Sequence, residues 1–98
     1  MSAPMHSRAG TFRDSPEYKA AFRAAQIAYA LGNSVRESRE RLGWTQADLA
    51  AKAGMKQSAV SRFEAGDAIP TVQTLIRIAD ALGMRLGIRF VSAGQGES

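Results

Sequence analysis

Two short helical patterns separated by a glycine occupy residues 46–63, and their spacing restricts the fold more than any other feature of the sequence. Apolar side chains repeat at helical intervals on the inner faces of both patterns: Leu49, Val60 and Phe63. Ala50 is small enough for the second helix to cross close to the first. Gly54 follows the first helix, where a glycine can adopt the left-handed conformation that a sharp turn requires. The sequence therefore predicts two helices that cross at a fixed angle.

The residues before this unit predict a further helix at the N-terminal side. Ser15 can cap a helix, Pro16 is tolerated at its first position, and the acid that follows lies at the positive end of the helix dipole. We expect an N-terminal helix over 15–32, preceded by a flexible tail over 1–14. Aromatic residues recur along it at helical spacing: Tyr18, Phe22 and Tyr29. Whether this helix breaks at Gly32-Asn33 or continues is left open by the sequence.

Residues 33–83 are predicted to form one domain of successive short helices. A helix ends at Gly43, and Thr45 is placed to cap the next one, with Asp48 at the third position after the cap. Thr71 is placed to cap the last helix of this domain, which ends at Gly83. The expected result is an all-α fold.

Residues 84–91 alternate in the way of a half-buried strand, and we expect a flexible tail over 92–98. Apolar and other residues take turns along this segment: Leu86, Ile88 and Phe90 against Arg85, Gly87 and Arg89. A single strand leaves its backbone groups unpaired, and no other segment resembles a strand. We therefore expect it to pair with the same strand of a second subunit in a homodimer.

Composition excludes several classes of function. The 98 residues contain no cysteine and only one histidine, His6, so we expect no disulfide, no metal site and no cofactor. Thirteen Lys and Arg against nine Asp and Glu give a net charge of +4, which favours a polyanionic partner. No apolar run is long enough for a membrane span or a signal peptide, so we expect a cytoplasmic, nucleoid-associated protein without membrane contact. No arrangement of acids, bases or nucleophiles predicts an enzyme.

The unit over 46–63 resembles the signature of the Cro/repressor-type (XRE) helix-turn-helix family. The resemblance rests on a set of residues at fixed offsets: Gln46, Leu49, Ala50, Gly54, Met55, Val60 and Phe63. Gly43-Trp44-Thr45-Gln46, residues 61–66 and residues 70–83 extend it, with Trp44 where the family usually has leucine. The resemblance implies a lambda-repressor-like bundle of about five helices, to which the C-terminal β-strand would add a dimer contact.

In that family the third helix of the domain enters the major groove of DNA, which assigns roles to residues by position. The expected base contacts are Gln57, Ser58, Ser61 and Arg62, and the expected phosphate contacts are Gln46, Lys56 and Thr71. The structural motif residues are Leu49, Ala50, Gly54, Val60 and Phe63. Arg39 and Glu64 occupy the positions of an internal ion pair. The alternative interpretation is that the polar residues form only a solvated helix face.

The resemblance implies a sequence-specific transcriptional regulator that binds a palindromic operator on double-stranded DNA as a homodimer. The aromatic helix before the domain and the strand after it resemble the layout of HigA-type antitoxins, which predicts a toxin partner bound through the N-terminal helix. A stand-alone homodimeric repressor without a toxin is the alternative. The aromatic residues can equally be core or dimer contacts. Arg8 and Arg13 are either a basic arm on DNA or part of a tail.

Overall fold

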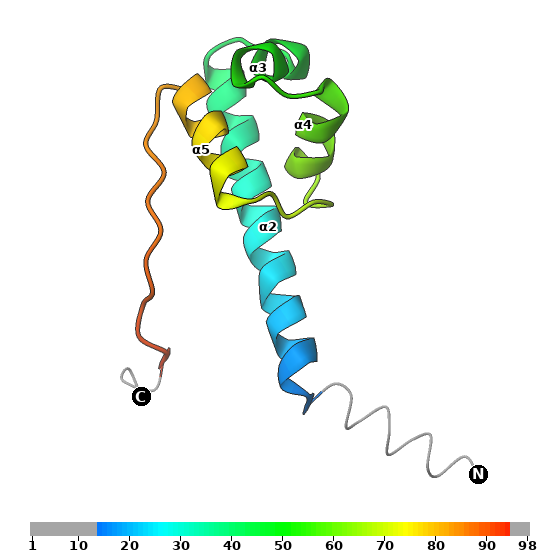
Figure 1. Cartoon of the computed structure of the whole chain (residues 1–98), viewed down its shortest axis with the longest axis vertical. Helices are drawn as coiled ribbons and strands as arrows, with labels where there is room; N and C mark the ends of the chain where they lie inside the picture. The colour runs from blue at the N-terminus through cyan, green and yellow to red at the C-terminus, as the bar shows by residue number, and fades with distance from the viewer. Residues whose placement is uncertain (1–13, 95–98) are drawn as a thin grey trace, which may run out of the picture.

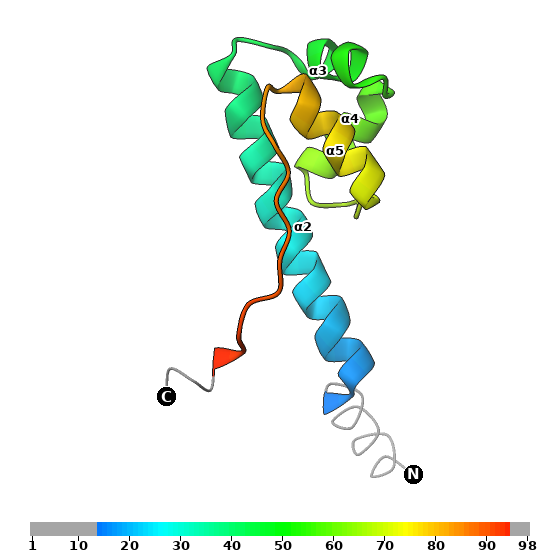
Figure 2. The same ribbon diagram turned by 60° about the vertical axis from the view of Figure 1, so that its left-hand side comes forward.

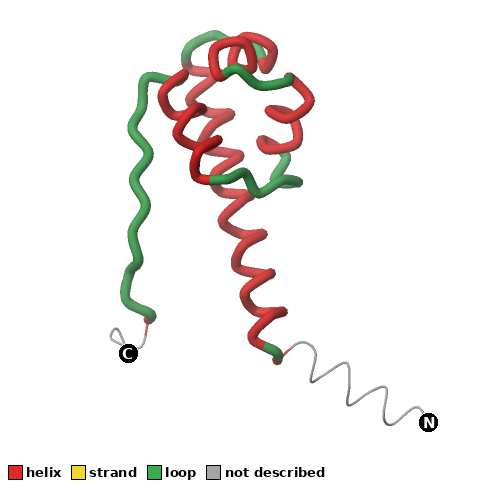
Figure 3. The backbone as a smooth tube through the Cα atoms, in the orientation of Figure 1, coloured by secondary structure: helices red, strands yellow, loops and turns green. Residues whose placement is uncertain are grey.

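The chain folds into a helical bundle, which a computed structural model describes over residues 14–94. Four helices follow one another in this part: α2 (Pro16–Arg41), α3 (Gln46–Ala53), α4 (Gln57–Glu64) and α5 (Val72–Ala81), labelled as in Figure 1. Residues 14–94 contain no strand, as the tube in Figure 3 shows. The prediction of an all-α fold is confirmed.

α2 is one continuous helix of 26 residues, so the prediction of about five helices was wrong in its count for the described part. Ser15 caps it as predicted, because its Oγ accepts a hydrogen bond from the Tyr18 N–H at 3.0 Å. The helix passes through Gly32 without a break. Gly32 is buried at the crossing with α4, and this packing outweighs the weak helix preference of glycine, about 1 kcal/mol. Figures 1 and 2 show that the N-terminal half of α2 extends beyond the other helices.

The core lies where the short helices meet the C-terminal half of α2. α4 packs against α2 and α3, and α5 packs against α3. The largest fully buried side chains are Phe63, Leu49, Ile78 and Val60. Burying an apolar side chain of this size contributes roughly 1.5–3 kcal/mol. Three of these four residues belong to the α3–α4 unit, so the same side chains that form the core also hold α4 in place.

The α3–α4 unit begins and turns with the local chemistry that the sequence predicted. Thr45 Oγ1 accepts from the Asp48 N–H at 3.0 Å, and the Asp48 carboxylate accepts from the Thr45 N–H at 2.8 Å, which is a complete capping box. Gly54 ends α3 with φ of 68°, and the Met55 N–H then donates to the Ala50 carbonyl at 2.8 Å. Thr71 caps α5 through the Thr74 N–H.

The segment after α5 is extended, and the predicted strand over Met84–Val91 is not supported in the single chain. Toward the C-terminus, the last backbone hydrogen bond in the described part runs from the Met84 N–H to the Ala79 carbonyl at 2.8 Å. A strand is defined by its pairing, and residues 14–94 supply no second extended segment. Leu86 is half-buried against the bundle, whereas Ile88 and Phe90 are exposed.

Residues 1–13 and 95–98 lie outside the described part of the chain. The expectations for His6, Arg8, Arg13, almost all of the N-terminal tail and the end of the C-terminal tail fall there. Within residues 14–94, no helix is long and apolar enough to cross a membrane. The same residues contain no group of three or more potential metal ligands.

Candidate nucleic-acid interface

One face of α4 is polar and exposed, and the opposite face is buried. Val60, Phe63 and Glu64 point into the bundle and are at most 2% exposed. The residues predicted to contact bases all lie on the outer surface: Gln57, Ser58, Ser61 and Arg62. Their spacing places them along one side of the helix, because residues three and four apart are neighbours on a helix surface. α4 therefore presents hydrogen-bonding side chains as a continuous strip.

Positive charge gathers beside this strip. An open hollow of about 440 Å³ lies between the α3–α4 turn, α4 and the start of α5. Its lining includes two of the predicted phosphate contacts, Lys56 and Thr71, together with Arg62 and Arg77, and contains no acidic residue. Lys56 and Thr71 are both exposed. This surface can attract an anion, and the lining offers no carboxylate that would oppose it.

A buried ion pair joins α4 to α2. The Arg39 guanidinium donates to the Glu64 carboxylate through Nε at 2.7 Å and through Nη2 at 2.8 Å, so the contact is bidentate. Nη1 of Arg39 donates to the Trp44 carbonyl at 2.8 Å. Nε2 of Gln46 donates to the Glu64 carboxylate at 3.1 Å. These bonds tie the C-terminal ends of α2 and α4 to the beginning of α3.

The ion pair changes the titration of both partners. Burial alone would raise the pKa of Glu64, but hydrogen bonds from Arg39 and Gln46 and the charge of Arg39 outweigh it, and the pKa is lowered. The hydrogen bond to Glu64 raises the pKa of Arg39, although burial acts in the opposite direction. Glu64 is therefore an anion at neutral pH, and the buried charge is compensated.

The α3–α4 turn is also held from α5. Nε of Arg77 donates to the Ala53 carbonyl at 3.1 Å, and its Nη2 donates to the Gly54 carbonyl. Carbonyls at the end of a helix have no partner within the helix and are stabilised by a cation. Arg77 thus satisfies the end of α3 at the point where the chain turns into α4.

Sequence reasoning missed two of these roles. Gln46 was expected to contact phosphate through its backbone N–H, but the hydrogen bond of its side-chain amide to Glu64 was not expected. Arg77 was not singled out, because its carbonyl partners lie 23 and 24 residues earlier in the chain. The clustering of a lysine and two arginines around the hollow likewise depends on the packing of α4 against the start of α5.

Residues 35–88 match the family described as Helix-turn-helix, and this match covers α3, α4, α5 and the end of α2. The chain belongs to the Cro/repressor-type helix-turn-helix family. This family consists of DNA-binding regulators, and the recognition helix of its fold corresponds to α4.

Curated proteins from distant organisms share this domain. The chain is 34% identical over 61 residues to endothelial differentiation-related factor 1 of Homo sapiens, covering 62% of this chain and 41% of that protein. It is 36% identical over 56 residues to antitoxin HipB of Escherichia coli strain K12, covering 57% of this chain and 64% of that protein. The chain thus spans less than two thirds of either relative.

Two solved structures have a similar fold. The restriction-modification controller protein C.AhdI from Aeromonas hydrophila superposes with a TM-score of 0.60 at 27% identity, covering 61% of this chain and 91% of that chain. A chain of a HipA-HipB-O2-O3 complex superposes with a TM-score of 0.57 at 31% identity, covering 66% and 92% respectively.

Proposed function

We propose that the protein is a sequence-specific transcriptional regulator that binds a palindromic operator as a homodimer through α4. The observation that carries the proposal is the exposed polar strip on α4, whose opposite face is locked into the core. Side chains can specify bases only if the helix that bears them has a fixed orientation. The buried bond of Glu64 to α2 and the contact of Arg77 with the turn supply that orientation here.

Each side chain of the strip has a suitable chemistry for one kind of contact. Gln57 can bond bidentately to adenine and Arg62 to guanine in the major groove, whereas the hydroxyls of Ser58 and Ser61 can bond to bases or phosphates. Lys56 and Thr71 lie beside the strip, on the hollow that Arg62 and Arg77 also line. We assign them to the phosphates, together with the N-terminal end of α3 at Gln46.

Variants of the strip and of its flanks are expected to change binding in different ways. Gln57→Ala and Arg62→Ala remove base contacts and should each lower discrimination by about 1–3 kcal/mol at one position of the operator. Lys56→Ala removes a phosphate contact, so it should weaken all sequences about equally and reduce the salt slope by about one. Selection from a random duplex library, followed by titrations at several salt concentrations, measures both effects.

Matched controls separate these roles from general damage. Gln73→Ala makes the same chemical change at an exposed position of α5, and Arg23→Ala does so on the projecting half of α2. Both should leave sequence preference unchanged. If Gln57→Ala and Lys56→Ala altered binding in the same way, the division between base and phosphate contacts would be wrong.

We further propose that the protein is the antitoxin of a toxin–antitoxin pair and represses its own operon. Two likenesses support this role, namely to antitoxin HipB and to a chain of the HipA-HipB-O2-O3 complex. We assign the toxin contact to the N-terminal half of α2, which projects beyond the other described helices (Figure 1). Phe22 is 56% exposed on it, and Tyr29 is exposed near the middle of the helix.

If the antitoxin proposal is right, a protein encoded beside this chain is expected to co-purify with it. Co-expression with a tag on this chain measures the capture. Phe22→Asp should abolish the capture by placing a charge on the projecting half of α2, whereas Arg62→Ala, on the DNA-facing strip, should retain it. Growth arrest by the neighbouring protein alone should be relieved by co-expression.

The alternative is a stand-alone homodimeric repressor without a toxin. The likeness to a restriction-modification controller protein favours this candidate. Absence of any co-purifying neighbour, together with an intact operator footprint, would contradict the antitoxin role and leave this one.

A further inference from the structure

At the C-terminal end of the described chain, the backbone groups and most of the apolar side chains lack partners within residues 14–94. The backbone after Met84 makes no hydrogen bond within residues 14–94, although it is extended. Its apolar side chains are also uncovered: Ile88 is 66% exposed, Phe90 is fully exposed and Val91 is 75% exposed. An extended segment with free backbone groups and bare apolar side chains is a template for pairing with another chain.

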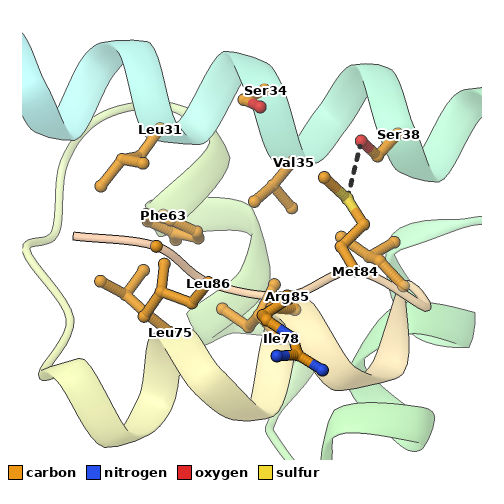
Figure 4. A pocket seen from close by; sticks show the side chains of 13 residues that line it. Leu31, Ser34, Val35, Ser38, Phe63, Leu75, Ile78, Met84, Arg85 and Leu86 are labelled. Atoms are coloured by element: carbon orange, nitrogen blue, oxygen red, sulfur yellow. Dashed lines mark hydrogen bonds between the residues drawn. The ribbon is translucent and has the colours of Figure 1, made fainter.

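One face of this segment is directed at the bundle. Leu86 lines a small hollow of about 110 Å³ between α2 and α5, together with Leu31, Phe63 and Leu75 (Figure 4). Met84 contacts α2 as well, because its Sδ accepts from Ser38 Oγ at 3.4 Å. In an extended chain alternate residues share a face. Residues 84, 86, 88 and 90 therefore share the face of Leu86, called the inner face below, although Phe90 itself is fully exposed in the single chain.

The inner face continues beside a larger open hollow of about 440 Å³. Apart from the segment itself, its lining comes from α2, the loop before α5 and α5: Ile27, Leu31, Ile69, Pro70 and Leu75. All five residues are apolar. Arg89 is the only charged residue in this lining. The hollow thus offers apolar cover for side chains of the same kind that the segment leaves exposed.

We propose that a second copy of residues 84–91 lies antiparallel beside the first, with the two-fold axis at Ile88, and places the Phe90 of the partner subunit over Leu86 in the larger hollow. This inference rests on the proposed homodimer and names its contacts. The occupant is a second copy because this segment carries both a free backbone edge and the side chains that match the hollow. Pairing of the two copies supplies hydrogen-bond partners to both backbones at once, and its two-fold symmetry closes the assembly as a dimer.

The charges of the segment select the position of the axis. An axis at Gly87 would place Arg85 opposite the partner's Arg89, twice, and like charges directly opposite one another are destabilising. An axis at Arg89 would place this arginine opposite itself. An axis at Leu86 would bring Phe90 against the end of α5, and an axis at Phe90 would leave Leu86 opposite Gly94. Registers with an axis between two residues place apolar side chains opposite charged ones.

With the axis at Ile88, no arginine lies opposite another arginine, and Leu86, Ile88 and Phe90 all lie opposite apolar side chains; among the apolar residues only Val91, on the outer face, lies opposite an arginine. Leu86 lies opposite the partner's Phe90, and Ile88 lies opposite its own copy. On the outer face, Arg85 lies opposite the partner's Val91, and Gly87 lies opposite the partner's Arg89. The apolar pairs then fall on the side where the hollow is.

Single-cysteine variants test the register directly, because the full chain contains no cysteine. Directly opposed residues of an antiparallel pair have Cα atoms about 4.5–5.5 Å apart, which suits a disulfide. Ile88→Cys should therefore cross-link to its own copy under mild oxidation, about tenfold faster than Gly87→Cys or Arg89→Cys, which are offset from their copies. Non-reducing electrophoresis measures the rates.

The possible results distinguish a wrong register from the absence of the homodimer on which the register rests. Fastest cross-linking at Gly87 or Arg89 would overturn the register. Absence of cross-linking in a protein that sediments as a dimer would overturn the inference and leave the homodimer intact. A monomer at all concentrations would contradict the proposed homodimer itself.

A second pair of variants tests whether the partner's Phe90 occupies the larger hollow. Phe90→Ala should raise the dimer dissociation constant about thirtyfold or more, because it removes a buried aromatic anchor. Val91→Ala, on the outer face next to it, should change this constant by about threefold at most. Equal effects in sedimentation would overturn the placement of the ring. Neither residue belongs to the buried core, so circular dichroism should show unchanged helix content in both variants.

Discussion

Replacing Glu64 with alanine is expected to lower the free energy of unfolding by about 3–5 kcal/mol. The guanidinium of Arg39 is inside the bundle, where the residue is 8% exposed, and it would lose both hydrogen bonds to the carboxylate. Gln46 would lose its bond as well. Urea unfolding followed by circular dichroism, at one fixed protein concentration, measures the loss.

Two controls show whether the stranded charge causes this loss. Asp67→Ala removes an exposed carboxylate from the loop after α4 and should change stability by no more than about 0.5 kcal/mol. Replacing both partners, with Arg39→Met and Glu64→Leu, should recover most of the loss because no buried charge remains unpaired. A double variant as unstable as Glu64→Ala would show that the charge is not the cause.

The same pair predicts a dependence of stability on pH. The folded-state pKa of Glu64 is lowered, so its contribution is fully present above the ordinary pKa of a glutamate, about 4.3, and is lost as the pH falls through the folded-state value. Glu64→Gln does not titrate. The stability difference between the wild type and this variant should therefore be constant near neutral pH and shrink in acid. A difference that grew in acid would contradict the direction of the shift.

Substituting alanine for Gly32 is expected to destabilise the protein by about 2–3 kcal/mol, although the same change stabilises most helices. An added Cβ would lie 2.9 Å from the Glu64 carbonyl oxygen and closer still to that of Phe63. Both are backbone atoms, which cannot rotate away. The gain in helix preference is about 1 kcal/mol and does not compensate. Urea unfolding measures the net change in the free energy of unfolding. Operator affinity should also fall in this variant.

Gly83→Ala is the matched control for this substitution. No atom lies within 4 Å of a Cβ added at Gly83, so only its positive φ of 73° opposes alanine. The expected loss is about 1 kcal/mol. If Gly32→Ala were the more stable of the two variants, α2 and α4 would not cross as closely as the structure shows.

The features that could be predicted from the sequence are those that depend on neighbouring residues. The caps at Ser15, Thr45 and Thr71 and the turn at Gly54 each involve a side chain or a backbone angle within a few residues. The outward position of Gln57 followed from helical spacing around a recognisable core. These local rules define the α3–α4 unit almost completely.

The features that could not be predicted depend on contacts between distant segments. Local preference left open whether the helix breaks at Gly32-Asn33, and close packing against α4 keeps α2 continuous. The hydrogen bond of Arg77 to the α3–α4 turn joins α5 to α3, and no periodic pattern in the sequence predicts it. The segment over Met84–Val91 has the alternation of a strand, yet pairing requires a second edge that residues 14–94 do not contain.

Because α2 is continuous, the rotation of its N-terminal end about the helix axis is fixed relative to its C-terminal end. Pro16 to Arg41 spans about 39 Å as a single rod, and Gly32 and Arg39 fix the C-terminal part of the rod against α4. Inserting one residue before Gly32 would turn the projecting end by about 100° without altering the crossing. A partner bound at Phe22, as proposed above, would thus be held in one defined direction relative to α4. A change in the number of residues before Gly32 would be enough to change this direction.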